Sequence, residues 1–447
     1  MAALPTGSEP EGGRERGGSL LIRGGTVVSP RGKERANVLV RGGKIEALTT
    51  LSPEADLVLD AEGLLVLPGV VDPHVHFRQP WIGSEAEDWV SGSRAAAAGG
   101  VTTVLDMPNT SPPTTTLDRL LEKFRLVESS RPCVNYGFHF GATPSNLGEL
   151  TAVGISSATP IPPPPGQLAA SVKIFMGSST GDLLLTDLGA IRQFANSAKM
   201  ISVHAEDESV IRACASEPDH GSRRPKRAAL TAIRKLLSVG KEGRVYVCHV
   251  TSYAEADLAA PFYREATPHH LFLTSEAMER IGAYAKVNPP LRGEQDRASL
   301  WRALLEGKID AIGSDHAPHT REAKESDSPP SGVPGVETSL PLMVDASMRG
   351  MIRLEDVVRL MSHSPARIFR IRGKGSLEPG RDADIVLVDP REERRVDPDN
   401  LHYKCGWTPY EGMVLRGWPV ATVLGGSLAY MRGEFYPARG SAVTYAA

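Results

Sequence analysis

Residues 71–77 read VDPHVHF, and the neighbours of this short run decide the fold. It places His74 and His76 two positions apart in an apolar segment, so in a strand both imidazoles point to the same face. A helix-like stretch, EDWVSGSRAAAAGG (87–100), and a second apolar strand, VTTVLDM (101–107), come next. This order predicts parallel strands joined by crossover helices.

The same alternation continues to about residue 370 and gives eight strands in all. Eight strands with helices between them predict an α/β fold, a (β/α)8 barrel of the TIM type, over residues 69–370. Polar residues gather at the strand ends, where such barrels carry their chemistry. The six further strands are VNYGFHFG (134–141), SVKIFMG (171–177), MISVHAED (200–207), RVYVCHV (244–250), REATPHHLFLT (264–274) and IDAIGSDH (309–316).

Short strands separated by turns flank the barrel on both sides. Residues 19–68 and 371–440 share this texture, which predicts one small β-sandwich domain built from both chain ends. Residues 1–18 are polar and rich in glycine, so we expect a disordered tail. The proline-rich run ATPIPPPPGQ (158–167) predicts a stiff, exposed connection, and a docking segment for a partner is the alternative.

The composition is typical of a soluble globular protein. With a formal net charge of -3 over 447 residues, the chain has no basic surplus for nucleic acid or an anionic membrane. The first residues lack a basic start followed by an apolar run, so we expect no signal peptide, and no stretch approaches about 18 apolar residues. Its four cysteines form no CxxC pair, which favours reduced thiols. We therefore expect a cytoplasmic protein.

Further candidate metal ligands end other strands of the predicted barrel. His204 and His249 each close an apolar strand, and Asp315 adds a carboxylate at the end of the eighth. A lone histidine at a strand end is more often a hydrogen-bonded core residue. Convergence of four histidines on one barrel mouth instead favours a metal centre, and imidazole with oxygen ligands suits zinc.

Lys173, in the fourth strand, faces the same mouth. A buried ammonium beside metal ligands would be costly. Its conversion by carbon dioxide to a carbamate would give an anionic oxygen ligand able to bridge two cations, whereas a salt bridge to a carboxylate is the plainer alternative. Two ions about 3.5–4 Å apart would hold a hydroxide and polarise a carbonyl.

This set of residues resembles the amidohydrolase superfamily over most of residues 20–435. That family has His-x-His at strand one, a carboxylated lysine at strand four, histidines at strands five and six and an aspartate at strand eight. The resemblance implies two divalent cations, with Asp315 also acting as the proton-transferring residue. The implied metal ligands are His74, His76, N6-carboxylated Lys173, His204, His249 and Asp315.

Four other residues narrow the resemblance to the dihydroorotases among cyclic amide hydrolases. They are Arg78 in HFR, Asn109 in DMPNT, Asn288 in KVNPPLR and His319 in GSDHAPH. The resemblance implies that they bind the substrate, and that Arg78, Asn109 and His319 hold its free carboxylate. It also implies interconversion of N-carbamoyl-L-aspartate and L-dihydroorotate, and a homodimer or homotetramer.

Three alternatives stay open at this stage: a hydantoinase, an allantoinase, or a non-catalytic scaffold for aspartate transcarbamoylase. Two departures from the dihydroorotase pattern bear on them, namely Gln79 where glutamate is common and the missing acidic residue in RRPKRAALTAI (223–233). The remaining histidines are expected to be structural or exposed. Of the neighbours His269 and His270, at most one would face the site if both lay in a strand.

Overall fold

The computed structural model describes residues 18–80, 83–158, 166–179 and 181–446. Almost all of the predicted tail and residues 159–165 of the proline-rich run lie outside this range. Within the described part of the chain, no helix has the length and apolar character that a membrane crossing requires.

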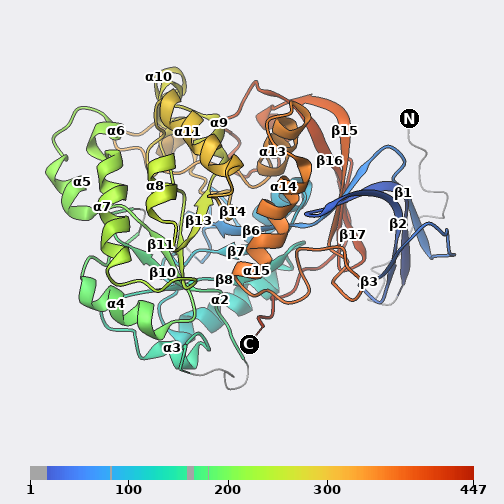
Figure 1. Cartoon of the computed structure of the whole chain (residues 1–447), viewed down its shortest axis with the longest axis horizontal. Coiled ribbons are helices and arrows are strands. Elements are labelled where there is room, and N and C mark those ends of the chain that lie inside the picture. The colour runs from blue at the N-terminus through green and yellow to red at the C-terminus, as the bar shows by residue number, and fades with distance from the viewer. Residues whose placement is uncertain (1–17, 81–82, 159–165, 180, 447) are drawn as a thin grey trace.

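Eight parallel strands form a closed barrel, which confirms the predicted fold class (Figure 1). β8 and β9 act as one strand interrupted at His139, and they join a three-stranded to a six-stranded sheet. A parallel bridge between Val75 and His316 closes the circle. The strands are β6 (Val70–Val75), β7 (Val101–Asp106), β8 (Asn135–Phe138), β9 (Phe140–Gly141), β10 (Val172–Phe175), β11 (Ile201–His204), β12 (Val245–Val247), β13 (Tyr263–Ala266) and β14 (Ala311–Ile312).

Helices cover the outside of this barrel. The first one begins with a capping box at Asp88, whose carboxylate accepts from the N–H groups of Val90 and Ser91. The helices are α1 (Trp89–Ala98), α2 (Leu117–Ser130), α3 (Glu149–Ala152), α4 (Leu188–Ser197), α5 (Glu208–Ala213), α6 (His220–Arg223), α7 (Lys226–Leu237), α8 (Tyr253–Leu258), α9 (Pro268–Phe272), α10 (Glu276–Ile281), α11 (Glu294–Leu305), α12 (Arg321–Lys324), α13 (Ser339–Met348), α14 (Leu354–Val358) and α15 (Ser364–Ile368).

The seventh predicted strand is shorter than the sequence pattern indicates. It ends at Ala266, and residues Pro268–Phe272 form helix α9. Proline at the first helical position favours this switch, because its missing N–H would have no helical partner there. His269 and His270 are therefore on a helix, and both are buried. The predicted alternation of strand residues therefore does not apply to them.

A second sheet of nine strands combines both ends of the chain. β5 pairs with β1 on one side and with β15 on the other, so the two halves share one hydrogen-bonded sheet. The β2–β3 turn contacts residues 381–383, so the sheet curls over its own apolar core. The strands are β1 (Ser19–Ser29), β2 (Gly32–Arg41), β3 (Lys44–Thr49), β4 (Leu57–Asp60), β5 (Leu65–Pro68), β15 (Ile385–Arg395), β16 (Val414–Leu424), β17 (Ser427–Met431) and β18 (Glu434–Phe435).

The two parts of the molecule meet through specific polar contacts as well as apolar packing. Thr422 on β16 donates to the carbonyl of Ala97 at 2.7 Å, and Asn135 on β8 donates to Asp384 at 2.9 Å. Both contacts are buried. The sheet is therefore held against the side of the barrel.

Candidate metal centre

Several predicted site residues lie just beyond the ends of barrel strands. Arg78, His249 and Asp315 have positive φ angles of 64°, 38° and 48°. Such angles are uncommon for residues other than glycine and often mark functional positions. Strand β6 ends at Val75, so Arg78 lies outside it. Tight turns instead aim these side chains at the barrel mouth.

His74, His76 and Asp315 converge on one point. His74 directs Nδ1 at the Glu265 carboxylate 2.8 Å away, and His76 directs Nδ1 at the side-chain oxygen of Asn109, also 2.8 Å away. With Nδ1 of each ring directed at these oxygens, Nε2 is the nitrogen of each ring that is available as a metal ligand. These two nitrogens lie 3.1 and 3.2 Å from Asp315 Oδ1. Two ring nitrogens and a carboxylate oxygen that face one another form a donor set able to hold a cation.

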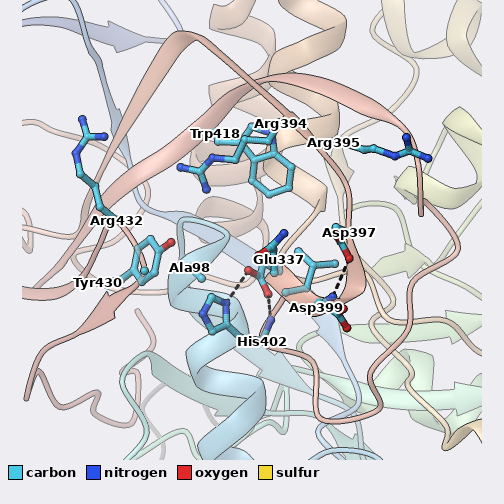
Figure 2. A pocket seen from close by; sticks show the side chains of 13 residues that line it. Ala98, Glu337, Arg394, Arg395, Asp397, Asp399, His402, Trp418, Tyr430 and Arg432 are labelled. Atoms are coloured by element: carbon cyan, nitrogen blue, oxygen red, sulfur yellow. Dashed lines mark hydrogen bonds and ion pairs between the residues drawn. The ribbon is translucent and has the colours of Figure 1, made fainter. Parts of the chain in front are cut away.

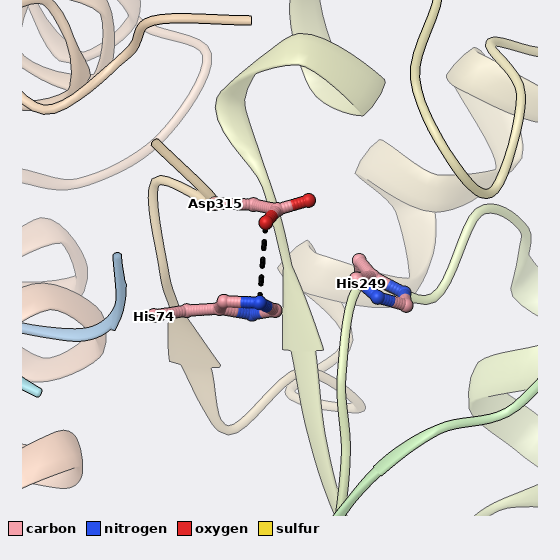
Figure 3. Close-up of side chains that lie close together, drawn as sticks. All are labelled: His74, His249 and Asp315. Atoms are coloured by element: carbon pink, nitrogen blue, oxygen red, sulfur yellow. Dashed lines mark ion pairs between the residues drawn. The ribbon is translucent and has the colours of Figure 1, made fainter. Parts of the chain in front are cut away.

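A second convergence joins His204 and His249. His204 Nδ1 lies 3.1 Å from His249 Nε2, whereas His204 Nε2 lies 2.9 Å from the Glu206 carboxylate. The carboxylate fixes the proton on His204 Nε2, so the Nδ1 lone pair faces the neighbouring ring. Ligand atoms of His74, His249 and Asp315 lie within 4.8 Å of one another, which links the two convergences (Figure 3).

Lys173 lies in the floor of the same site. Its side chain is 1% exposed, and its Nζ lies 3.0 Å from Cys248 Sγ. Among the described residues no carboxylate forms an ion pair with it, so the salt-bridge alternative has no support. Its charge lowers the pKa values of His204 and His249, in addition to the larger effect of burial. An uncompensated ammonium among imidazoles is unfavourable, and a carbamate at this atom would remove the conflict.

The electrostatics of the site suit cations. Burial opposes the charged form of His74, yet the Glu265 and Asp315 carboxylates raise its pKa well above the ordinary value. Burial lowers the pKa of His76 to about 4, so its imidazole is in the neutral form that metals bind. Burial opposes ionisation of Asp315 too, but the imidazoles of His74 and His76 hold its pKa well below the usual range. Asp315 is therefore a carboxylate at neutral pH.

Arg78 and His319 form a second group beside Asp315. Arg78 is 7% exposed and donates through Nε to the carbonyl of Pro318 at 2.9 Å. Its Nη2 lies 3.1 Å from His319 Nε2, and that nitrogen lies 3.0 Å from the carbonyl of Ser331. Burial lowers the pKa of Arg78 to about 10, so the guanidinium stays charged. Within the described chain it has no carboxylate at salt-bridge distance.

The other two predicted substrate residues differ in position. Asn109 lies behind His76 and orients its ring. Asn288 lies on the wall of a neighbouring cavity, and its buried side-chain oxygen has no hydrogen-bond partner among the described residues. That oxygen can accept a ligand N–H group.

Three residues of the site were missed at the sequence level. Glu265 contacts His74 and also accepts from the backbone N–H of His249 at 3.0 Å, while Glu206 fixes the tautomer of His204. Cys248 contacts Lys173. Burial in apolar strands was the available signal for Glu265 and Glu206, because fully buried carboxylates need a partner.

The other histidines have varied surroundings. His139 is buried between Ser171 and the carbonyl of Pro73, and His363 is exposed. His402 contacts Glu337 (Figure 2). His220 lies 2.8 Å from the carbonyl of Val287 and lines the cavity beside Asn288. His269 is buried, and neither of its ring nitrogens has a partner in the described part of the molecule.

The sequence profile of the amidohydrolase family matches residues 65–210 and 244–429. The chain belongs to the amidohydrolase family. Two curated relatives that are named dihydroorotase are similar to this chain over most of its length. That of Halobacterium salinarum is 38% identical over 410 residues, covering 88% of this chain and 93% of the relative. That of Pyrococcus abyssi is 37% identical over 398 residues, covering 87% and 89%.

Solved amidohydrolase structures superpose closely on this chain. The L-hydantoinase (dihydropyrimidinase) of Arthrobacter aurescens has a TM-score of 0.86 at 30% identity, covering 95% of this chain and 99% of that one. The dihydropyrimidinase of Brevibacillus agri has a TM-score of 0.84 at 26% identity, covering 96% and 98%. The barrel and the sheet from both chain ends are therefore shared architecture.

Proposed function

We propose that this chain is a dihydroorotase, a metal-dependent cyclic amide hydrolase that interconverts N-carbamoyl-L-aspartate and L-dihydroorotate, a step of pyrimidine synthesis. The curated relatives that it matches at 38% and 37% identity carry that name. The observation that carries the proposal within this chain is the buried guanidinium of Arg78 beside the candidate metal centre.

An unpaired buried cation needs an anion. The Arg78 side chain has hydrogen-bonding capacity left after its contacts with Pro318 and His319. A carboxylate can accept two parallel charge-assisted hydrogen bonds from a guanidinium. Dihydroorotate carries a carboxylate on its ring, whereas the hydantoin ring itself carries none. Arg78 therefore favours dihydroorotate over hydantoins.

The proposed metal ligands that would hold two divalent cations are His74, His76, His204, His249, Asp315 and an N6-carboxylated Lys173. Imidazole and oxygen donors fit zinc. When bound, such a pair of cations would lower the pKa of a water molecule and polarise the ring amide carbonyl. The convergence of these ring nitrogens on the Asp315 oxygen and on one another supports this ligand set.

We assign proton transfer to Asp315. In the hydrolytic direction its carboxylate accepts the proton of the attacking water and donates it to the departing ring nitrogen. Arg78, Asn109 and His319 hold the carboxylate of the substrate, and the free oxygen of Asn288 accepts an N–H group of the ring or carbamoyl unit. Ring closure follows the same proton transfers in reverse.

The second candidate is a hydantoinase-type enzyme, which the superposed structures favour. A scaffold for aspartate transcarbamoylase is a weaker alternative, because every predicted ligand residue is present. The proposal further includes a cytoplasmic location and a homodimer or homotetramer. It also divides the chain into a β-domain, formed by residues 19–68 and 371–440, and a barrel domain, formed by residues 69–370.

A substrate panel tests the proposal. Purified protein is assayed with L-dihydroorotate, N-carbamoyl-L-aspartate, hydantoin and allantoin, with and without prior chelation, and its metal content is measured. We expect turnover of the first two compounds, loss on chelation and recovery with Zn²⁺. Turnover of hydantoin or allantoin alone would contradict the dihydroorotase assignment, and a metal-free, inactive protein would favour the scaffold.

A further inference from the structure

A cavity of about 580 Å³ opens beside the candidate metal centre. Its lining comes from residues near 178, from α5 and α6, and from the segments around 286 and 330. The charged side chains that line it are all basic, and no aspartate or glutamate lines it among the described residues. These basic residues are Arg212, Arg223, Arg224 and Lys286.

Two of the four basic side chains form ion pairs with acidic residues that lie outside the cavity lining. Arg224 is paired with Glu206 at 2.5 Å, and Arg212 with Glu208 at 2.9 Å. The acidic partners do not line the cavity. These two ion pairs therefore stabilise the cavity wall and add little net charge to the cavity.

The other two charges have no acidic partner within the described residues. Lys286 Nζ donates to the carbonyl of Pro329 at 2.6 Å, and Arg223 donates to the carbonyls of Glu217 and Pro218 at 2.6 and 3.2 Å. Carbonyl contacts orient these cations without cancelling their charge. Arg223 also lowers the pKa of Lys286, after the larger effect of burial, which indicates that the two charges lie close enough to repel.

The cavity reaches the catalytic region. Arg224 lines it and places Nη2 3.4 Å from Nε2 of His204, a proposed metal ligand. Asn288, with its unpartnered buried oxygen, lines it as well. His220 adds no positive charge at neutral pH, because burial lowers its pKa to about 4. The cavity thus presents two uncancelled positive charges beside the candidate metal centre.

We propose that Arg223 and Lys286 form an anion-collecting subsite at the mouth of the active site, selective for substrates with two carboxylates. N-carbamoyl-L-aspartate carries two and dihydroorotate carries one, so the subsite favours the ring-closing substrate. This inference rests on the proposed function. Clefts lined by charge of one sign raise the local concentration and the association rate of oppositely charged ligands.

The charge dependence gives a sharp test. Coulomb energy is proportional to the charge of the ligand, so the logarithm of the effect on the dianion should be twice that on the monoanion. In the Arg223→Gln/Lys286→Gln double variant at about 10 mM ionic strength, we expect kcat/KM to fall about tenfold for N-carbamoyl-L-aspartate and about threefold for dihydroorotate. The kcat values should change less than twofold. Arg234→Gln, which removes an exposed charge outside the cavity, is the matched control.

A salt titration of the unaltered enzyme involves no substitution, so its result does not depend on whether a variant folds. Raising the ionic strength from about 10 to 300 mM should lower kcat/KM for the dianion twice as steeply, on a logarithmic scale, as for the monoanion. Equal losses for both substrates, or a double variant that matches Arg234→Gln, would overturn the subsite.

Calorimetric binding of succinate separates this inference from the proposed function. The parental protein should bind succinate more tightly than the double variant at low salt, even if it turns over neither dihydroorotate nor N-carbamoyl-L-aspartate. Absence of turnover would refute the function alone, whereas equal succinate affinities would refute the subsite.

Discussion

Replacement of Arg78 by methionine removes the charge and the hydrogen-bonding fork but keeps a side chain of similar length. Methionine tolerates the φ of 64° no worse than arginine, because neither is glycine. The side chain is 7% exposed and has no acidic partner in the described chain, so its removal leaves no buried carboxylate unpaired. The substitution therefore tests ligand binding with little damage to the fold.

The expected loss follows from the two hydrogen bonds that Arg78 can give a carboxylate. A hydrogen bond to a charged group contributes about 1.5–3 kcal/mol. Two such bonds, partly replaced by water in the variant, leave a loss of about 3 kcal/mol. At about 1.36 kcal/mol per tenfold change, kcat/KM for dihydroorotate should fall on the order of 100-fold, mostly through KM. The melting temperature should stay the same or rise, because a buried unpaired cation is removed.

Steady-state dihydroorotate hydrolysis measures the first effect, and differential scanning calorimetry measures the second. Arg78→Lys should recover only part of the loss, because an ammonium cannot form the parallel pair. An unchanged KM in Arg78→Met would remove this residue from substrate binding. A fall in melting temperature together with loss of kcat would instead indicate that Arg78 supports the fold.

Three further outcomes are expected. Asp315→Asn should lower kcat by about 10²–10⁴-fold while part of the metal content remains, and near-parental kcat would refute its role in proton transfer. Lys173→Ala should lose metal and activity together, and short carboxylic acids such as acetate should restore some of each, whereas full activity without them would exclude a carboxylated lysine. Burial opposes ionisation of Asp207, but the Lys235 ammonium 2.5 Å away lowers its pKa, so its stabilising effect is present above about pH 4 and is lost as pH falls. Asp207→Asn should therefore lower the melting temperature more at pH 7 than near pH 3, and an equal deficit at both would refute the ion pair as the cause.

The barrel was predictable because its strands repeat one pattern: an apolar run, a polar residue at its end, and then a helix. Each of the eight predicted strands overlaps a strand of the structure. The misplaced feature, α9, begins at Pro268 inside an otherwise strand-like run. Its apolar residues suit either conformation, and the context of the folded barrel selects the helix.

The candidate site was predictable only as a set of residue types. The pattern singled out His74, His76 and Asp315, but not the turns with positive φ that aim Asp315 at the imidazoles. Nor could it assign tautomers, because the partner of His74 is Glu265, almost two hundred residues away. Such contacts depend on the closed barrel, so they become visible only in three dimensions.

The pairing of β5 with β15 has a consequence for biosynthesis. Leu67 is hydrogen-bonded across the ladder to the strand that contains Val386, so β5 has an open edge until nearly the whole polypeptide has left the ribosome. At translation rates of about 5–20 residues per second, that interval lasts for tens of seconds. An unpaired apolar edge is prone to aggregate during such a delay. We therefore expect nascent chains to rely on chaperones. The yield of folded protein should improve when cells are grown at lower temperatures.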